Sequence, residues 1–377
     1  MSDRDHFAEL SHKMLQKDDL AQQDRQFWVE YILRQLRGKD MIETYTLGDI
    51  IEWNFTGENS NGDTIIFTQE QLKIPISSII STYNLIADPA EKEDVRVMHV
   101  DGTNVYVGGG YTTYKSVLCN GVFKFDTLSG GYYGFGNGLA TANTVEGVGV
   151  NSTGTLYAAG ALSNINGTGQ QGGAAYWNGT TWVEIGSFAI NECNHLVIDS
   201  DDNVYFGGSF TDVGDANGDK IVKWNGSAFS SLGSGLDGNC YGLAIDTSDN
   251  IYAVGAFTGN ASKWSGSAWS SLGGTFDAAP DVVRVFGDEA YICGDFTTPY
   301  PSVVKWNGTE FSGFGGGGGI NDIAVLSDGT VYGCAGTSVY YWSGSEWTAV
   351  ATFTSASVTH ICVDANDNIY IGLSYSP

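Results

Sequence analysis

One peptide occurs in two nearly identical copies in this chain, and this repetition constrains the fold more than any other feature of the sequence. Residues 221–235 read IVKWNGSAFSSLGSG, and residues 261–274 read ASKWSGSAWSSLGG. A segment that recurs at a regular interval indicates one supersecondary unit built several times, because each unit must stack on a neighbour to bury its apolar face. The rest of the chain is therefore best examined for further copies.

Two short signatures recur along the chain. The first is an apolar residue, a tyrosine and a short run into glycine; it occurs seven times, at Tyr106, Tyr157, Tyr205, Tyr252, Tyr291, Tyr332 and Tyr370, with spacings of 38 to 51 residues. The second follows most of these tyrosines and reads YWNGTTW, KWNGSAF, KWSGSAW, KWNGTEF or YWSGSEW. Each repeat therefore predicts two successive hairpins.

The unit around Tyr252 shows the four predicted strands. GLAID from Gly242 leads through the turn TSDN into IYAVG, and a loop then leads to ASKW and AWSSLG. Asn-Gly or Ser-Gly between the last two strands favours a tight turn in which both central residues have positive φ. Four antiparallel strands repeated about every forty residues are typical of a β-propeller, so the predicted fold class is all-β.

The last repeat offers a test of ring closure. Only seven residues follow Tyr370, which leaves room for two strands. Trp182 precedes Tyr205 by 23 residues, and Tyr83 precedes Tyr106 by the same interval. We therefore expect residues 81–88, with 72–78 beside them, to supply the outer strands of the last blade and to close a seven-bladed propeller over residues 71–377. Such pairing removes open sheet edges.

Residues 1–70 do not contain the repeat. Two helices are predicted, one over about 5–16 and one that starts after Asp18-Asp19 and ends at Gly38. DIIEWNF and TIIFTQ predict a β-hairpin connector within 46–70. The second helix carries a broad apolar surface: Phe27, Trp28, Tyr31, Ile32, Leu33 and Leu36. This surface must be covered. It packs on the ring in one interpretation, and in the other it makes residues 1–45 an attachment and oligomerisation segment.

Charge and composition exclude several classes of partner. The net charge is −26, from 43 Asp and Glu against 17 Lys and Arg, which argues against a nucleic acid or an anionic membrane as partner. The N-terminus lacks the pattern of a secretory signal, and no apolar run is long enough to span a membrane. The six cysteines form no CxxC pair, and we expect them to be buried as small apolar residues.

The sequence contains no P-loop, GxSxG or HExxH motif. One acidic loop is similar to calcium-binding loops and contains Asp212, Asp215, Asn217 and Asp219. Its glycine comes too early, and no bidentate Glu follows. Calcium is therefore the one cofactor considered, beside the simpler interpretation of a solvated loop.

Polar residues recur at the start of the innermost strand. His195, Asp322 and His360 each stand ten residues before the tyrosine of their repeat, and His99 and Arg284 share a second register. The favoured interpretation is a polar lining of a wet central channel. The alternative is a cation site, although His195 lies in a blade too distant to share one ion directly with the other two.

The loops between the second and third strands and between consecutive blades share one face of a propeller. On this face we expect Asp212 and Asp215 together with a candidate ligand-binding set: Tyr111, Tyr114, Asn191, Glu192, Asp237, Asp277, Tyr300 and Asn321. Aromatic faces that stack on rings and carboxylates that accept hydroxyl hydrogens suit a sugar. The alternative is that these are ordinary solvated loop residues.

Motifs such as NVYVGG and KWNGSAF resemble kelch-like propeller repeats of bacterial surface proteins and of phage virion or tail proteins. With a helical head and no secretory signal, the resemblance implies a non-enzymatic virion appendage: a tail fibre, spike or capsid decoration. It would be made in the host cytoplasm, oligomerise and contact other virion proteins through residues 1–45, and bind host surface glycans. A kelch-type interaction scaffold is the alternative. A propeller enzyme is a third hypothesis. The absence of paired carboxylates at equivalent positions of the repeats argues against it.

Overall fold

The computed structural model describes most of the repeat region. The described residues are 55–58, 64–67, 94–139, 144–162, 165, 173–186, 188, 193–315, 319–353 and 356–374. The expected helices, the proposed assembly residues Phe27 to Leu36 and the expected closing strands in 72–88 lie outside this set. No helix in the described part is long and apolar enough to cross a membrane.

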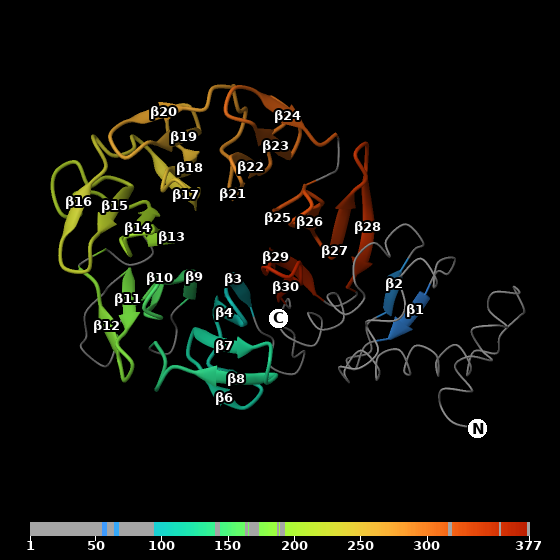
Figure 1. Cartoon of the computed structure of the whole chain (residues 1–377), viewed down its shortest axis with the longest axis horizontal. Coiled ribbons are helices and arrows are strands. Elements are labelled where there is room, and N and C mark those ends of the chain that lie inside the picture. The colour runs from blue at the N-terminus through green and yellow to red at the C-terminus, as the bar shows by residue number, and fades with distance from the viewer. Residues whose placement is uncertain are drawn as a thin grey trace, which may run out of the picture.

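The repeats fold into antiparallel sheets arranged around a central axis, as Figure 1 shows. From the innermost to the outermost strand, the blades are built as follows. Blade 1 contains β3 (Val95–Asp101), β4 (Asn104–Gly109), β7 (Val122–Asp126) and β8 (Gly131–Gly134), and blade 2 contains β9 (Thr144–Val150), β10 (Leu156–Ala161), β11 (Ala174–Trp177) and β12 (Trp182–Glu184). Blade 3 contains β13 (Cys193–Ile198), β14 (Val204–Gly208), β15 (Ile221–Trp224) and β16 (Phe229–Ser231), and blade 4 contains β17 (Asn239–Ile245), β18 (Ile251–Ala256), β19 (Ala261–Trp264) and β20 (Trp269–Ser271). Blade 5 contains β21 (Val282–Phe286), β22 (Glu289–Cys293), β23 (Val303–Trp306) and β24 (Phe311–Gly313), and blade 6 contains β25 (Asp322–Val325), β26 (Val331–Ala335), β27 (Ser338–Trp342) and β28 (Trp347–Thr352).

The prediction of seven four-stranded blades needs correction. The described residues form six such blades and one two-stranded sheet, β29 (Ser357–Val363) with β30 (Ile369–Ser374), which lies between blades 6 and 1. The physical reason is that the second hairpin signature, with its Lys/Tyr-Trp strand, does not follow β30. Residues 72–88, expected to fill this place, are outside the described set.

Two smaller hairpins accompany the ring. β1 (Phe55–Glu58) pairs antiparallel with β2 (Thr64–Phe67), within the range expected for a connector, whose role as a connector stays a prediction. β5 (Thr113–Tyr114) pairs with β6 (Val117–Leu118) inside the loop between β4 and β7.

The two ends of the ring meet without a break between their innermost strands. Asp94 forms an isolated antiparallel bridge with Ser374, and the Thr359 hydroxyl donates a hydrogen bond of 2.7 Å to the carbonyl of Val95. Tyr370 packs in the same core cluster as Val95 and Phe123 of blade 1. The innermost strands β3, β9, β13, β17, β21, β25 and β29 thereby lie against one another in sequence around the axis.

The tyrosine of the first signature fixes where each core lies. All seven of these side chains are buried, and each belongs to an apolar cluster shared with the next blade around the ring. Tyr205 of β14, for example, packs with Cys240, Leu243 and Ile251 of blade 4. The core is therefore divided into apolar layers between neighbouring sheets, as the repeat predicted. All six cysteines are free thiols, and five are buried in these layers.

The second signature is explained by packing against the preceding blade. Trp264 and Trp269 enter the cluster between blades 3 and 4, their ring centroids 5.5 Å apart. Gly233, at the end of the SSLG segment of blade 3, has φ of +65° and lies under Trp264, where an added Cβ would come within 3.2 Å of the indole. The repeated glycine is thus required by both its backbone conformation and the next blade's tryptophan.

The expected turn geometry was wrong. Trp224 pairs with Phe229, so the loop between β15 and β16 has four residues, and of Asn225 and Gly226 only the glycine has positive φ, +92°. The Asn225 side chain instead accepts hydrogen bonds from the N–H groups of Ser227 and Ala228. The asparagine side chain therefore caps the turn as an Asx motif. The Asn-Gly pair in the sequence is compatible with both this four-residue loop and a two-residue turn.

Buried aspartates anchor the turns between the first two strands. Asp199 is 5% exposed and accepts hydrogen bonds from the backbone and side chain of Asn203 and from the Tyr205 hydroxyl at 3.0 Å. Lys223 lies 3.5 Å away on β15. Asp246 repeats the arrangement with Asn250, Tyr252 and Lys263, and Asp364 repeats it with Asn368 and Tyr370. These hydrogen bonds lower the pKa of Asp199 and Asp246 despite their burial, which by itself raises it.

A second aspartate in the same turns reaches the previous blade. Asp202, Asp249 and Asp367 all have positive φ, between +60° and +65°. Their carboxylates accept hydrogen bonds from the N–H and hydroxyl groups of Ser152, Ser200 and Ser327 respectively. Each turn thereby holds its own hairpin and links it to its neighbour.

We expect Asp199→Ala to lower the free energy of unfolding by about 2–4 kcal/mol, because it leaves Asn203, Tyr205 and Lys223 without their shared acceptor. Urea titration of the full chain measures the change. Asp201→Ala in the same turn is the control: its side chain is exposed, and the expected change is within about 0.5 kcal/mol. Equal effects of the two variants would contradict the anchoring role of Asp199.

Candidate functional site

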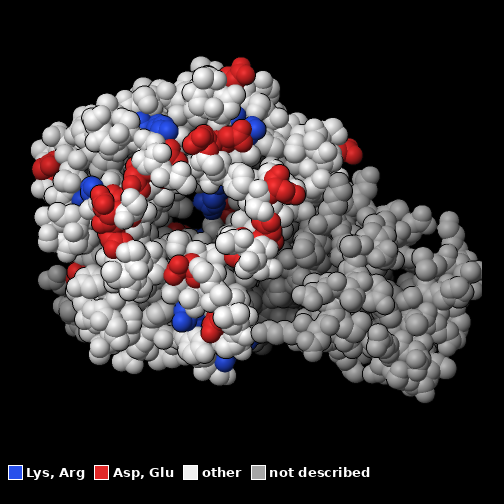
Figure 2. All heavy atoms as spheres, in the orientation of Figure 1, with Lys and Arg blue, Asp and Glu red and all other residues white. Residues whose placement is uncertain are grey.

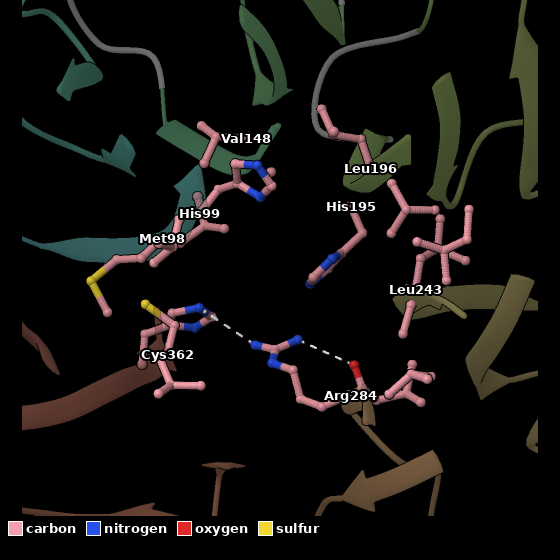
Figure 3. Close-up of a pocket in the computed structure, with 18 residues that line it drawn as sticks. Met98, His99, Val148, His195, Leu196, Leu243, Arg284 and Cys362 are labelled. Carbon is pink, nitrogen blue, oxygen red and sulfur yellow. Dashed lines mark hydrogen bonds between the residues drawn. The ribbon is translucent and has the colours of Figure 1, made fainter. Parts of the chain in front are cut away.

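The innermost strands enclose a cavity of about 300 Å³ on the axis of the ring. Its wall is contributed by β3, β9, β13, β17, β21 and β29 and is apolar apart from four side chains: His99, His195, Arg284 and His360. Figure 2 shows the opening, with acidic side chains gathered around its rim and basic atoms within it. Figure 3 shows that the polar groups converge on the centre of the cavity from different blades.

The side chains of Arg284, Asp322 and His360 form a network that joins blades 5 and 6 to the two-stranded sheet of β29 and β30. The Arg284 Nη2 atom lies 2.9 Å from Asp322 Oδ1, and His360 Nδ1 lies 2.9 Å from Asp322 Oδ2. Arg284 Nη2 is also 3.4 Å from His360 Nε2. Asp322 is 1% exposed and accepts a further hydrogen bond from the N–H of Ile361. A buried carboxylate is thus fully partnered.

The His360 ring lies between the two charged groups. Its Nδ1 atom faces Asp322 and its Nε2 atom faces the Arg284 guanidinium. The buried carboxylate therefore has two side-chain partners, one on β21 and one on β29.

The pKa of Asp322 follows from the same contacts. Burial alone would raise it, but Arg284 and His360 outweigh burial and lower the pKa to about 2. Asp322 consequently stays ionised at neutral pH and holds Arg284 in the channel. This is the role of an orienting residue rather than of a group exposed to a ligand.

The two remaining histidines are kept neutral. Burial, followed by the nearby charges of Arg284 and His360, lowers the pKa of His195 to about 3. Burial also lowers the pKa of His99, opposed by Asp101. Both rings line the cavity, so at neutral pH they present uncharged imidazoles to its interior.

The prediction of a polar channel lining is confirmed for His99, His195, Arg284 and His360. Asp322 differs, because it lies behind Arg284 and His360 instead of lining the cavity. A cation site here is contradicted: a guanidinium already occupies the position beside the carboxylate. Across the described residues, no group of three or more His, Cys, Asp or Glu is placed to hold a metal.

In the acidic loop, the carboxylates bond to backbone N–H groups of the loop itself. Asp219 accepts a hydrogen bond from the N–H of Asp212, and Asp215 accepts one from the N–H of Asn217. These carboxylates close turns within the loop and do not gather into a metal-binding group. The physical reason is that short acidic side chains satisfy local backbone N–H groups as readily as an ion.

Tyr111 and Tyr114 do not project from the loop face. Tyr114 is fully buried, stacked on Phe123 with centroids 4.3 Å apart, and Tyr111 is 7% exposed with its hydroxyl bonded to the carbonyl of Val107. The expectation that their rings are available to a ligand is therefore corrected. The β5–β6 hairpin folds back so that both rings fill the core of blade 1.

Asp237 and Asp277 lie on the loop face but serve the loops themselves. Asp237 accepts hydrogen bonds from the N–H and hydroxyl of Thr258, and Asp277 accepts the same pair from Thr297. These bonds lower the pKa of both aspartates. In each case the loop that enters a blade is tied to the loop between its second and third strands.

Two further members of the candidate set are described. Tyr300 is 43% exposed in the loop between β22 and β23, and Asn321 is exposed just before β25. The two loops are tied by a hydrogen bond from the N–H of Gly319 to the Ser302 hydroxyl. Asn191 and Glu192 lie outside the described residues.

Sequence reasoning missed the partnership of Arg284 with Asp322. The available signal was that both stand on the innermost strands of consecutive blades, 38 residues apart. Their two registers differ, however, and the sequence alone does not show that a long guanidinium reaches from one to the other.

Comparison with solved structures supports the architecture. The similar structures include the extracellular domain of BT4673 from B. thetaiotaomicron (TM-score 0.53, 11% identity, 77% of this chain and 38% of that one), the WD40 propeller domain of Doa1 (0.53, 13%, 75% and 90%) and the GH74 xyloglucanase of Xanthomonas campestris (0.56, 12%, 76% and 51%). The chain is a β-propeller. At these identities the likeness shows the fold alone.

No family model matches the sequence, and no curated protein matches it either. The resemblance to kelch-like repeats in particular is not shown by these comparisons and stays a prediction.

The depressed pKa of His195 gives a pH prediction. The folded state keeps this ring neutral down to a pKa of about 3, whereas the unfolded chain takes up a proton near pH 6.5. The stability that this provides is present above about pH 6.5 and is lost as the pH falls toward about 3. We expect His195→Gln to flatten the fall of the urea midpoint between pH 7 and pH 4. Parallel wild-type and variant curves would show that His195 does not titrate in this way.

Proposed function

We propose that this protein is a non-enzymatic binding protein in which a rigid propeller presents its loop face to a partner. The observation that supports this most directly is the use of loop-face carboxylates as loop ties: Asp237 with Thr258 and Asp277 with Thr297. Loops fixed in advance lose little conformational entropy when a partner binds. A propeller of this kind is consistent with a binding or scaffold role.

We further propose that the protein is a phage virion appendage: a tail fibre, spike or capsid decoration. The support comes from the sequence, in which repeats like those of virion propellers follow a helical segment with a broad apolar surface. In this proposal residues 1–45 associate with copies of the chain and with other virion proteins. The alternative is a kelch-type scaffold that is not part of a particle, in which the same apolar surface covers the ring of its own chain.

The helical segment decides between these proposals. We expect light scattering to give the full chain the mass of an oligomer, and we expect the double variant Ile32→Asp with Leu36→Asp to be a monomer. Burying two unpaired carboxylates in an apolar contact has a desolvation penalty that exceeds the free energy of association. The β-sheet circular dichroism of the variant should be unchanged.

The control for this experiment is Gln22→Asp with Gln23→Asp, which adds the same charge to a polar part of the same helix. It should remain an oligomer. If the wild-type full chain is itself a monomer, the appendage proposal loses its assembly device and the scaffold alternative is favoured.

The proposed ligands on the loop face are host surface glycans, and Tyr300 is the best placed described aromatic. Its ring is 43% exposed and lies over Gly313 of β24, where an added Cβ would come within 2.4 Å of Tyr300 Cγ. A ring supported from behind offers a flat face on which a sugar can stack.

We expect Tyr300→Ala to reduce binding of the full chain to host polysaccharide about tenfold, as measured by biolayer interferometry. Tyr133→Ala is the matched control, because Tyr133 is 47% exposed but stands on β8 at the outer edge of blade 1. An equal loss in both variants, or none in either, would rule out Tyr300 as the stacking residue.

A further inference from the structure

We propose that the axial cavity is a binding site for a small monocarboxylic acid with an apolar body. The site is separate from the loop face, and the inference does not depend on a virion role.

The Arg284 guanidinium has more N–H donors than the described residues around it accept. A guanidinium has five N–H groups. Within the described part of the chain, Nη2 uses its two on Asp322 and His360, and Nη1 uses one on the carbonyl of Val283. The Nε–H group and the second Nη1–H group remain, on a side chain that lines the cavity and is 25% exposed. Either of these donors can bond to a carboxylate oxygen.

His99 and His195 face the same space from the opposite wall, on β3 and β13 (Figure 3). Neither ring has a hydrogen-bond partner among the described residues, and burial and charges alone account for their lowered pKa values. Each neutral imidazole offers one N–H donor. Partly buried polar rings without partners are costly unless a water or a ligand satisfies them. A carboxylate held by Arg284 would be within the space that these rings enclose.

The rest of the wall indicates the body of the ligand. Val97, Met98, Val148, Leu196, Leu243 and Val285 line the cavity, together with further aliphatic residues. A cavity of about 300 Å³ whose wall combines aliphatic residues with a few convergent polar groups is within the size range of small-molecule sites. An inorganic anion would satisfy the donors but leave this apolar surface wet, so an acid with a short hydrocarbon chain fits better.

The charge of the site limits the ligand to one negative charge. Arg284 is the one arginine or lysine among the side chains that line the cavity, burial keeps His99 and His195 neutral, and the chain as a whole carries −26. A monocarboxylate adds one charge beside a guanidinium. A second charge on the ligand would have no counter-charge in the described wall, and it would approach past the acidic rim seen in Figure 2.

The test is isothermal titration of the full chain at pH 7 with hexanoate, with its neutral isostere hexanamide and with inorganic phosphate. We expect hexanoate to bind at least tenfold more tightly than either, since the amide lacks the charge and phosphate lacks the apolar body. Arg284→Gln should weaken hexanoate binding at least tenfold, and His195→Gln should weaken it about threefold or more.

Two controls keep the result interpretable. Arg96→Gln removes an exposed arginine of β3 that pairs with Asp94 and Glu146 outside the cavity, and it should bind hexanoate as the wild type does. Because Arg284→Gln also removes the partner of buried Asp322, its fold is checked by circular dichroism. His195→Gln breaks no hydrogen bond between described residues, so its effect on binding stands even if Arg284→Gln does not fold.

Three outcomes would overturn the proposal. Wild-type protein that binds none of the three probes has no such site. Equal affinity for hexanoate and hexanamide would make the cavity a neutral apolar pocket. Hexanoate binding that is unchanged in both Arg284→Gln and His195→Gln would place the ligand elsewhere. None of these results bears on oligomerisation through residues 1–45, so failure here is distinct from failure of the proposed function.

Discussion

The structure depends on a buried aspartate at the turn between the first two strands of a repeat. In blades 3 and 4, Asp199 and Asp246 each gather an asparagine, a tyrosine hydroxyl and a lysine around one carboxylate. The tyrosine is also the residue that fills the core between neighbouring sheets. One carboxylate therefore holds the hairpin turn and the main core side chain together, while Asp202 and Asp249 tie adjacent turns together.

The axial cavity exists because this packing holds the innermost strands apart by a fixed amount. Small or aliphatic residues at most positions of these strands leave a space, and the few long polar side chains extend into it. Asp322, behind the wall, holds Arg284 and His360 in one arrangement, since a buried carboxylate with two partners has little freedom to reorganise. The polarity of the channel is thus set by one carboxylate that the channel itself does not expose.

Acidic and aromatic side chains in the loops have different structural roles although their sequence contexts are similar. Asp237 and Asp277 tie loops, Asp215 and Asp219 close turns, and Tyr114 fills a core. Only Tyr300 among the described tyrosines of the candidate set keeps an exposed ring. An Asp, Asn or Tyr in a turn-rich repeat is therefore as often part of the scaffold as part of a site, and burial and hydrogen bonding distinguish the two.

The sequence by itself determined the repeat, the strand order within each blade, the blade-to-blade role of the repeated tyrosines and tryptophans, and the polar character of the channel. These follow from local periodicity and from residues that recur at one position. It did not determine that β29 and β30 stand as a two-stranded sheet in the described structure, that Arg284 reaches Asp322 across a blade boundary, or that Tyr111 and Tyr114 turn inward. Those features depend on contacts between residues whose separation in sequence carries no pattern, and only the closed ring, which fixes the distance from one blade to the next, brings them together.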